Sequence, residues 1–128
     1  MSIERIDTLV VGGGQAGLAM SSYLTQLGRE HVVLERGRIG EAWRSERWDS
    51  LVFQFPNWTL QLPGYPYQED DPDGFAPRAD VVRFLEGYAS FIHAPLRGGV
   101  LVVSIRQRAG TERLLVQTET ATIEAVNV

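Results

Sequence analysis

The chain has 128 residues, which is enough for one compact domain with its own core, and it contains no cysteine. Its net charge of −4 argues against a nucleic-acid or anionic-membrane partner, and the missing thiols exclude disulfides, cysteine zinc sites and thiol catalysis. The first residues lack the apolar core of a signal peptide, and no apolar run reaches membrane-spanning length. The sequence therefore predicts a soluble, cytoplasmic protein.

The first predicted elements are a strand, a glycine-rich turn and a helix. A short apolar run at residues 9–11 is typical of a buried parallel strand. Three glycines follow on the spacing G-x-G-x-x-G: Gly12, Gly14 and Gly17. Apolar residues then recur at helical intervals over residues 16–27, and Gly28 is a natural C-terminal stop.

Each part of this spacing suits a dinucleotide. Gly12 permits the tight turn after the strand, Gly14 lets backbone amides approach a pyrophosphate, and Gly17 lets the helix lie close to the sheet. The helix begins near Gln15 and Ala16, so its free N–H groups and positive dipole end would face the phosphates.

A second strand is predicted at residues 31–34, with Glu35 at its end and eighteen positions after Gly17. An acid about 20 residues beyond the glycines can accept hydrogen bonds from a ribose. The alternative, a glycine-rich loop that binds nothing, leaves Glu35 unexplained. The ordered pattern therefore predicts dinucleotide binding.

Residues 36–77 are predicted to be irregular and are rich in aromatic side chains, glycine and proline. So many aromatics must pack on the rest of the domain, on a cofactor, or on a missing part of the protein. The acidic run Glu69, Asp70, Asp71 and Asp73 lacks calcium-loop spacing and contains Pro72, so a solvated turn is favoured over a metal site.

The last predicted elements are one helix and three strands. The helix begins after Pro77 and carries an apolar face over residues 81–92. His93 at its end is expected to interact with the helix dipole rather than to act as an acid or base. Strands are predicted at residues 100–105, 113–118 and 122–126.

Several motifs, in a fixed order over nearly the whole chain, resemble the N-terminal part of flavin-containing monooxygenases of the bacterial class B type. They are Leu34-Glu35-Arg36, Gly40-Glu41-Ala42-Trp43-Arg44, Arg47-Trp48-Asp49-Ser50-Leu51, Pro56-Asn57-Trp58, Leu62-Pro63-Gly64 and Asp71-Pro72-Asp73-Gly74-Phe75, after the glycine fingerprint. This group also includes Baeyer–Villiger-like enzymes. The resemblance implies that the fingerprint binds FAD.

The resemblance also implies individual roles. The pyrophosphate of FAD would lie on Gly12, Gly14, Gln15, Ala16 and Gly17, and the adenosine ribose on Glu35. Arg36 would lie by the adenosine, Trp43 and Arg44 along the flavin, and the backbone of Val102 against the adenine. Surface arginines and a core tryptophan are the alternatives for Arg36, Arg44 and Trp43. For Asn57, a residue facing the flavin and a cap of the turn after Pro56 both stay open.

The resulting fold class is α/β, a partial Rossmann-like FAD domain of the two-dinucleotide-binding flavoprotein kind, with a small β-meander at its C-terminal end. The strand at residues 100–105 would run parallel in the sheet. One incomplete domain over residues 1–128 is expected, without the NADPH domain and without the core strand into which the last segment leads in the resembled family. An unpaired edge and uncovered aromatic surface would then need the missing C-terminal half or self-association.

By the same resemblance, the whole enzyme would use FAD, NADPH and O2 to oxygenate a small organic substrate, and this chain alone would be inactive because it has no NADPH site. No catalytic acid, base or nucleophile and no metal site is predicted. Two alternatives stay open: another two-dinucleotide flavoprotein, such as a disulfide-reductase-like or amine-oxidase-like enzyme, and a non-catalytic remnant that keeps the fold.

Overall fold

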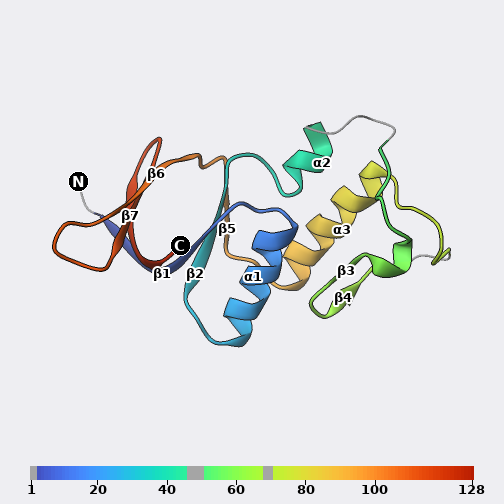
Figure 1. Ribbon diagram of the computed structural model, residues 1–128, viewed down its shortest axis with the longest axis horizontal. Helices are drawn as coiled ribbons and strands as arrows, with labels where there is room; N and C mark the ends of the chain where they lie inside the picture. The colour runs from blue at the N-terminus through green and yellow to red at the C-terminus, as the bar shows by residue number, and fades with distance from the viewer. Residues whose placement is uncertain (1–2, 46–50, 68–70) are drawn as a thin grey trace.

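The computed structural model describes residues 3–45, 51–67 and 71–128 (Figure 1). The helices are α1 (Gln15–Gln26), α2 (Glu41–Ser45), the 3-10 turn η1 (Asn57–Thr59) and α3 (Arg78–Phe91). The strands are β1 (Glu4–Val11), β2 (His31–Glu35), β3 (Gln61–Leu62), β4 (Tyr65–Pro66), β5 (Leu96–Gly98), β6 (Val102–Gln107), β7 (Leu114–Thr118) and β8 (Thr122–Asn127). The predictions for Arg47, Trp48, Asp49, Ser50, Glu69 and Asp70 fall outside the described residues.

One six-stranded sheet has the order β5-β2-β1-β8-β7-β6. Its first four strands are parallel, with Val10 opposite Val33 in β2 and Ile6 opposite Ala125 in β8. The meander β6-β7-β8 is antiparallel, and its last strand lies parallel beside β1. The predicted α/β Rossmann-like class with a C-terminal meander is confirmed.

The sequence pattern missed one strand of the sheet. The parallel neighbour of β2 is the short β5, a three-residue strand ending in glycine that carries no periodicity. The predicted strand at residues 100–105 corresponds to β6. Its hydrogen-bonded neighbour β7 is antiparallel both to β6 and to β8, so β6 runs in the direction of the parallel strands, as predicted. Strand β8 pairs with β1 from Glu4 to Thr8.

Helix α1 ends where its sequence predicts. Gly28 has a φ of +67°, which glycine adopts without a Cβ clash. The Gly28 amide donates to the Thr25 carbonyl at 3.0 Å, and the Arg29 amide donates to the Leu24 carbonyl at 2.8 Å. These are the two hydrogen bonds of a Schellman cap, so the turn satisfies carbonyls at the helix end.

The core is built in layers, with α1 between the sheet and α3 (Figure 1). Toward the sheet, Leu24 of α1 packs with Val10 and Val33. Toward α3, Leu18 joins a larger cluster with residues that include Phe84 and Tyr88. A third cluster, centred on Leu9, Leu34, Val116 and Ile123, holds the meander to the strands.

Much of the aromatic segment packs on α3. The Tyr65 ring stacks on Phe84 with centroids 5.4 Å apart, and the fully buried Tyr88 donates its hydroxyl to the Pro63 carbonyl at 3.0 Å. Phe55 and Trp58 remain more than half exposed. The rest of the domain therefore covers some of these aromatic side chains, which is one of the three packing partners that the sequence analysis considered.

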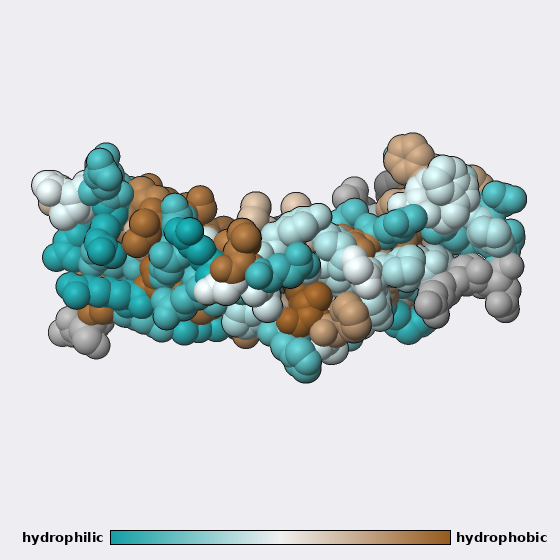
Figure 2. All heavy atoms as spheres, turned by 90° about the horizontal axis from the view of Figure 1, so that it is seen from below, coloured by the Kyte–Doolittle hydropathy of each residue, from teal (hydrophilic) through white to brown (hydrophobic). Residues whose placement is uncertain are grey.

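An apolar groove of about 630 Å³ lies between α1 and the ends of β1, β6 and β8. Its lining includes side chains that are about half exposed: Val11, Met20, Ile105 and Val128. Figure 2 shows hydrophobic residues gathered in patches on an elongated molecule. Self-association through such surface stays a prediction. No helix in the described part of the chain is long and apolar enough to cross a membrane.

The position of Leu18 generates a stability prediction. Leu18 is fully buried where α1 meets α3, whereas Leu27 at the end of α1 is 76% exposed. Leu18→Ala should lower the free energy of unfolding by about 3 kcal/mol, because it leaves a cavity between the layers. Leu27→Ala should change it by less than about 0.5 kcal/mol. Urea unfolding followed by circular dichroism measures both, and equal losses would contradict the layer assignment.

Candidate dinucleotide site

The glycine turn has the geometry that its spacing predicts. Gly12 has a φ of +110°, and its amide donates to the Leu34 carbonyl of β2 at 2.7 Å. A Cβ built on Gly17 would lie 1.8 Å from the Gly12 carbonyl oxygen, so α1 crosses the end of β1 too closely for any side chain. A Cβ built on Gly14 would meet nothing within 4 Å, which leaves open space over the turn.

The start of α1 borders this open space. Gln15 and Ala16 are exposed there, and the first intrahelical hydrogen bond runs from the Leu18 amide to the Gly14 carbonyl at 3.0 Å. Gly14 is the N-cap residue and has no side chain to cap the helix. Because the first amides of a helix have no intrahelical acceptor, this end of α1 can receive an anion.

Glu35 is brought directly to the glycine turn. Its Oε1 accepts a hydrogen bond from the Gly13 amide at 2.9 Å, and its Oε2 accepts one from the Gly37 amide at 2.5 Å. The side chain is buried among these partners, with 8% of the residue exposed. Each carboxylate oxygen has two lone pairs, so both keep acceptor capacity for a sugar hydroxyl.

Gly13 is a residue of this site that the sequence pattern did not single out. A Cβ on Gly13 would lie 3.1 Å from both Cβ and Cγ of Glu35 and 3.3 Å from Leu96. The absence of a side chain therefore lets the carboxylate reach the Gly13 amide. The only available signal was that Gly13 is the middle glycine of the Gly12-Gly13-Gly14 run.

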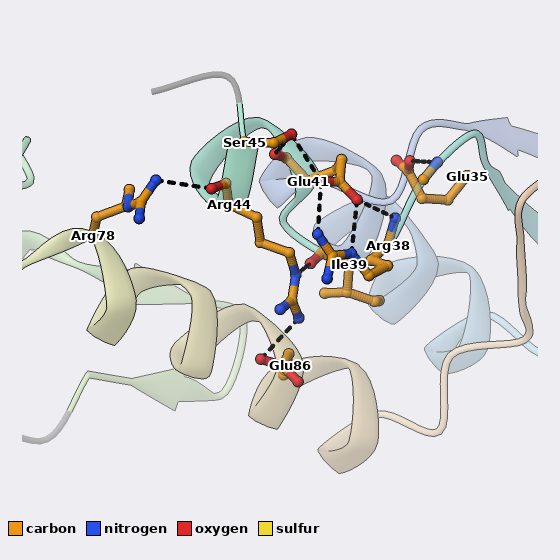
Figure 3. A network of polar contacts seen from close by, with 9 residues as sticks. Glu35, Arg38, Ile39, Glu41, Arg44, Ser45, Arg78 and Glu86 are labelled. Atoms are coloured by element: carbon orange, nitrogen blue, oxygen red, sulfur yellow. Dashed lines mark hydrogen bonds and ion pairs between the residues drawn. The ribbon is translucent and has the colours of Figure 1, made fainter. Parts of the chain in front are cut away.

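Arg36 and Arg44 lie in different surroundings. Arg36 is exposed and directly follows β2. Arg44 is turned toward α3: its Nε donates to the Ile39 carbonyl at 2.9 Å, and its Nη2 lies 2.9 Å from Oε1 of Glu86 (Figure 3). Arg44 thus holds α2 against α3 and is directed away from Glu35. Its expected place along a flavin stays a prediction.

Trp43 and Val102 are both partly buried. Trp43 packs against the cluster that joins α1 and α3, with its ring 6.3 Å from that of Phe53. Val102 begins β6 and packs against the cluster that contains Leu34. The backbone contact next to Glu35 is made two residues earlier, where the Val100 amide donates to the Glu35 carbonyl at 2.9 Å.

Asn57 is buried, and its side chain bonds to the turn at residues 71–74 and makes no cap of the turn after Pro56. It is 5% exposed, its Nδ2 donates to the Asp71 carbonyl at 2.8 Å, and its amide donates to the Gly74 carbonyl at 2.8 Å. Asp71 and Asp73 belong to the turn closed by the Gly74 amide on the Asp71 carbonyl. Asn57 therefore ties the start of η1 to this turn.

His31, the first residue of β2, is buried. Its Nε2 is 2.7 Å from the Ser21 hydroxyl, and its Nδ1 is 3.0 Å from the Arg29 carbonyl. A neutral ring with its proton on Nδ1 satisfies both contacts, because the carbonyl can only accept. With Ser21 fully buried, this pair joins α1 to β2 and offers no access to a substrate.

Glu41 lies at the start of α2 within a set of hydrogen bonds. Its carboxylate accepts hydrogen bonds from the Arg38 side chain, the Ser45 hydroxyl and the Arg38 amide (Figure 3). The Arg38 side chain is the main cause of a pKa lowered from 4.5 to about 2, with Ser45 next. Glu41 is therefore ionised at neutral pH and held in place.

A parallel sheet, a glycine turn that admits no side chain at Gly17 and an acid at the end of β2 define a Rossmann-like domain of the dinucleotide-binding kind. The family model for an NAD(P)-binding Rossmann-like domain matches residues 10–69. These residues include the turn, α1, β2 and α2.

The chain is similar in sequence to oxidoreductases and monooxygenases. An uncharacterised CzcO-like oxidoreductase of Geobacillus kaustophilus is 37% identical over 103 residues, which cover 80% of this chain and 29% of that protein. A probable indole-3-pyruvate monooxygenase, YUCCA3 of Arabidopsis thaliana, is 31% identical over 83 residues, covering 64% of this chain and 19% of that protein. The chain thus spans less than a third of these curated relatives.

A solved structure agrees with the sequence relatives. The flavin-containing monooxygenase of Stenotrophomonas maltophilia superposes with a TM-score of 0.82 at 27% identity, over 98% of this chain and 38% of that one. The chain is therefore a Rossmann-like domain related to CzcO-like oxidoreductases and flavin monooxygenases, which confirms the resemblance found in its motifs.

The close crossing at Gly17 yields a prediction with its own control. Gly17→Ala should lower the free energy of unfolding by about 3 kcal/mol or more, because the new methyl group would overlap the Gly12 carbonyl. Gly14→Ala should cost less than about 1 kcal/mol, since its methyl group would enter open space at a helix N-cap. Thermal unfolding of both variants without added ligand tests this, and equal stability would contradict the observed crossing.

The Glu41 carboxylate yields a prediction of pH dependence. Because its pKa in the folded protein is lowered, its contribution to stability is present above pH 4.5 and is lost as the pH falls toward 2. Arg38→Gln should raise the pKa of Glu41 toward 4.5, as followed by carbon NMR of the carboxyl group. Arg97→Gln is the matched control: it should raise the lowered pKa of Glu4 and leave that of Glu41 unchanged.

Proposed function

We propose that this chain is the FAD-binding portion of a flavin-dependent monooxygenase. The single observation that carries the proposal is the glycine turn itself, where open space over Gly14 lies beside a buried carboxylate, Glu35, that is tied to the Gly13 amide. A pyrophosphate needs close backbone approach, and a ribose needs an acceptor nearby. The similarity to flavin monooxygenases supports FAD as the dinucleotide in this proposal.

In this proposal the chain binds and orients the cofactor. The amides of the Gly12–Gly14 turn and the start of α1 receive the pyrophosphate, because they present N–H groups at the positive end of a helix. Glu35 accepts the ribose hydroxyls, while its bonds to Gly13 and Gly37 fix its orientation beforehand. Arg36 and Val102 remain candidates for the adenosine, and Trp43 and Arg44 for the flavin, on the strength of the family motifs alone.

When bound, FAD would supply the redox and oxygen chemistry, with electrons from NADPH, for the oxygenation of a small organic substrate. No catalytic acid, base or nucleophile is assigned to this chain. The NADPH site and most of the substrate site are proposed to lie in other parts of the whole protein. The chain alone is then expected to bind FAD without completing a catalytic cycle.

The proposal is tested by the visible absorption spectrum of the chain after incubation with FAD and removal of free cofactor. The expected result is retained flavin near one equivalent for the unmodified chain and none for Gly14→Ala, whose methyl group would occupy the pyrophosphate position. Because Gly14→Ala is expected to keep the fold, its melting temperature without FAD serves as the control.

The outcomes separate the alternatives. Flavin retained by Gly14→Ala would contradict the placement of the phosphate. An unmodified chain that retains no FAD, although its melting temperature shows that it is folded, would favour the non-catalytic alternative. Retention of NAD(P)H in place of FAD would favour another class of oxidoreductase.

A further inference from the structure

Strand β6 forms an open edge of the six-stranded sheet. It stands last in the strand order, and β7 is the strand that pairs with it among the described residues. A β-bulge between Val102 and Ser104 interrupts this pairing, after which residues 104–107 run in regular register with residues 114–117. Strands β6 and β7 lie at the end of the molecule away from α2 and α3 (Figure 1). None of the residues proposed for the dinucleotide lies in the stretch 104–107.

The regular stretch has backbone hydrogen-bonding groups on its outer side. The Arg108 amide donates to the Arg113 carbonyl at 2.8 Å, so the amide of Arg108 points toward β7. Because backbone groups in an antiparallel pair alternate between the neighbouring strand and the outside, the amides of Ile105 and Gln107 point outward. Both residues are exposed. An edge of this kind can pair with a further strand.

One face of this edge carries arginine side chains. Arg106 lies opposite Leu115, Leu115 opposite Glu124, and Glu124 opposite Arg5. Residues directly opposite each other point to the same face of a sheet, so Arg106 and Arg5 lie on either side of the buried Glu124 on one face.

The Glu124 carboxylate is shared by three arginines. Its Oε2 lies 2.7 Å from Nη1 of Arg108 and 3.4 Å from Nε of Arg5, and its Oε1 lies 3.5 Å from Nε of Arg113. A single carboxylate neutralises one of these three charges. The face therefore keeps a positive excess in a chain whose net charge is −4.

Arg106 adds a fourth guanidinium group at the edge itself. It is exposed, and its side chain has no hydrogen bond or ion pair with any of the described residues. Glu112, in the turn between β6 and β7, is the nearest further acid along the chain, and it leaves the excess positive. Asp7, on the same face of β1, is already paired with Arg29 at 2.9 Å.

The opposite face of the edge is apolar. Ile105 lies opposite Val116, and Val116 lies opposite Ile123. Val116 and Ile123 are buried, whereas Ile105 at the end of this row is 48% exposed. A strand added to β6 would alternate between the two faces, so its residues would meet guanidinium groups and apolar surface in turn.

We propose that the β6 edge binds an extended segment of another protein in which acidic and apolar residues alternate. The acidic side chains pair with Arg106 and the arginines behind it, the apolar ones cover Ile105, and the segment's backbone bonds to the outward groups of Ile105 and Gln107. A second copy of this chain is a poorer occupant. Pairing of two β6 strands would place both arginine faces side by side, and like charges across a strand pair are destabilising.

The probe for the test is a capped hexapeptide of alternating glutamate and valine, titrated into the unmodified chain and followed by NMR of the backbone amides. Saturable shifts are expected, largest at Ile105 and Gln107, and none at the other sheet edge, β5. Two comparison peptides should give no saturable shift. One has lysine in place of glutamate, and the other has every backbone amide methylated, so that it keeps the charge but cannot donate to a strand edge.

Charge variants at the two edges separate this site from a general effect of arginine. Arg106→Gln should weaken binding of the glutamate–valine peptide about five-fold. Arg97→Gln, which removes an arginine of β5 paired with Glu4, should leave it unchanged. Arg106→Glu should bind the lysine–valine peptide in preference to the glutamate–valine peptide, because the charge at the edge is reversed.

Four results would overturn the proposal. They are shifts that grow linearly without saturation, equal binding of the methylated peptide, equal losses in Arg106→Gln and Arg97→Gln, and shifts at β6 that depend on the concentration of the chain without peptide. The last result would show that a second copy occupies the edge. Melting temperatures close to that of the unmodified chain confirm that each variant is folded.

Discussion

The crossing of α1 over the end of β1 is the contact on which the rest of the structure depends. At this point the Gly17 backbone lies against the Gly12 carbonyl with no room for a Cβ. The close approach sets α1 at a depth where Leu24 reaches the sheet and Leu18 reaches the cluster on α3. A wider crossing would separate the helix from the sheet and open the turn that the helix follows. The same contact therefore fixes both the core and the geometry of the glycine turn.

A second constraint joins that turn to the neighbouring strand. The Glu35 carboxylate accepts amide hydrogens from Gly13 and Gly37, and the Gly12 amide donates to the Leu34 carbonyl. These bonds connect the ends of two parallel strands before any ligand is present. A carboxylate fixed in this way loses little conformational freedom when a ribose binds, because its orientation is already set. The buried acid is thus a structural support of the turn as well as a candidate ligand contact.

Segment 36–77 adds structure that a plain β–α–β unit lacks. Helix α2 is held to α3 through Arg44, Glu86 and Arg78, and the β3–β4 hairpin covers α3 with Tyr65. These contacts extend the molecule away from the sheet (Figure 1). The candidate dinucleotide site lies at the other side of this layer, at the carboxyl ends of the parallel strands.

The elements that could be predicted from the amino-acid sequence are those that depend on interactions between near neighbours. The spacing of Gly12, Gly14 and Gly17, the stop at Gly28 and the periodicity after Pro77 specified the turn and two helices, because glycine conformation and helical repeats depend on near neighbours. The sequence also indicated Glu35 and the flavin-enzyme relationship. Only the tertiary structure decided that β5 pairs with β2, that β8 lies beside β1, and that Arg44 turns to Glu86. Strand order and ion-pair partners depend on residues far apart in the chain, and neither leaves a periodic signal in the sequence.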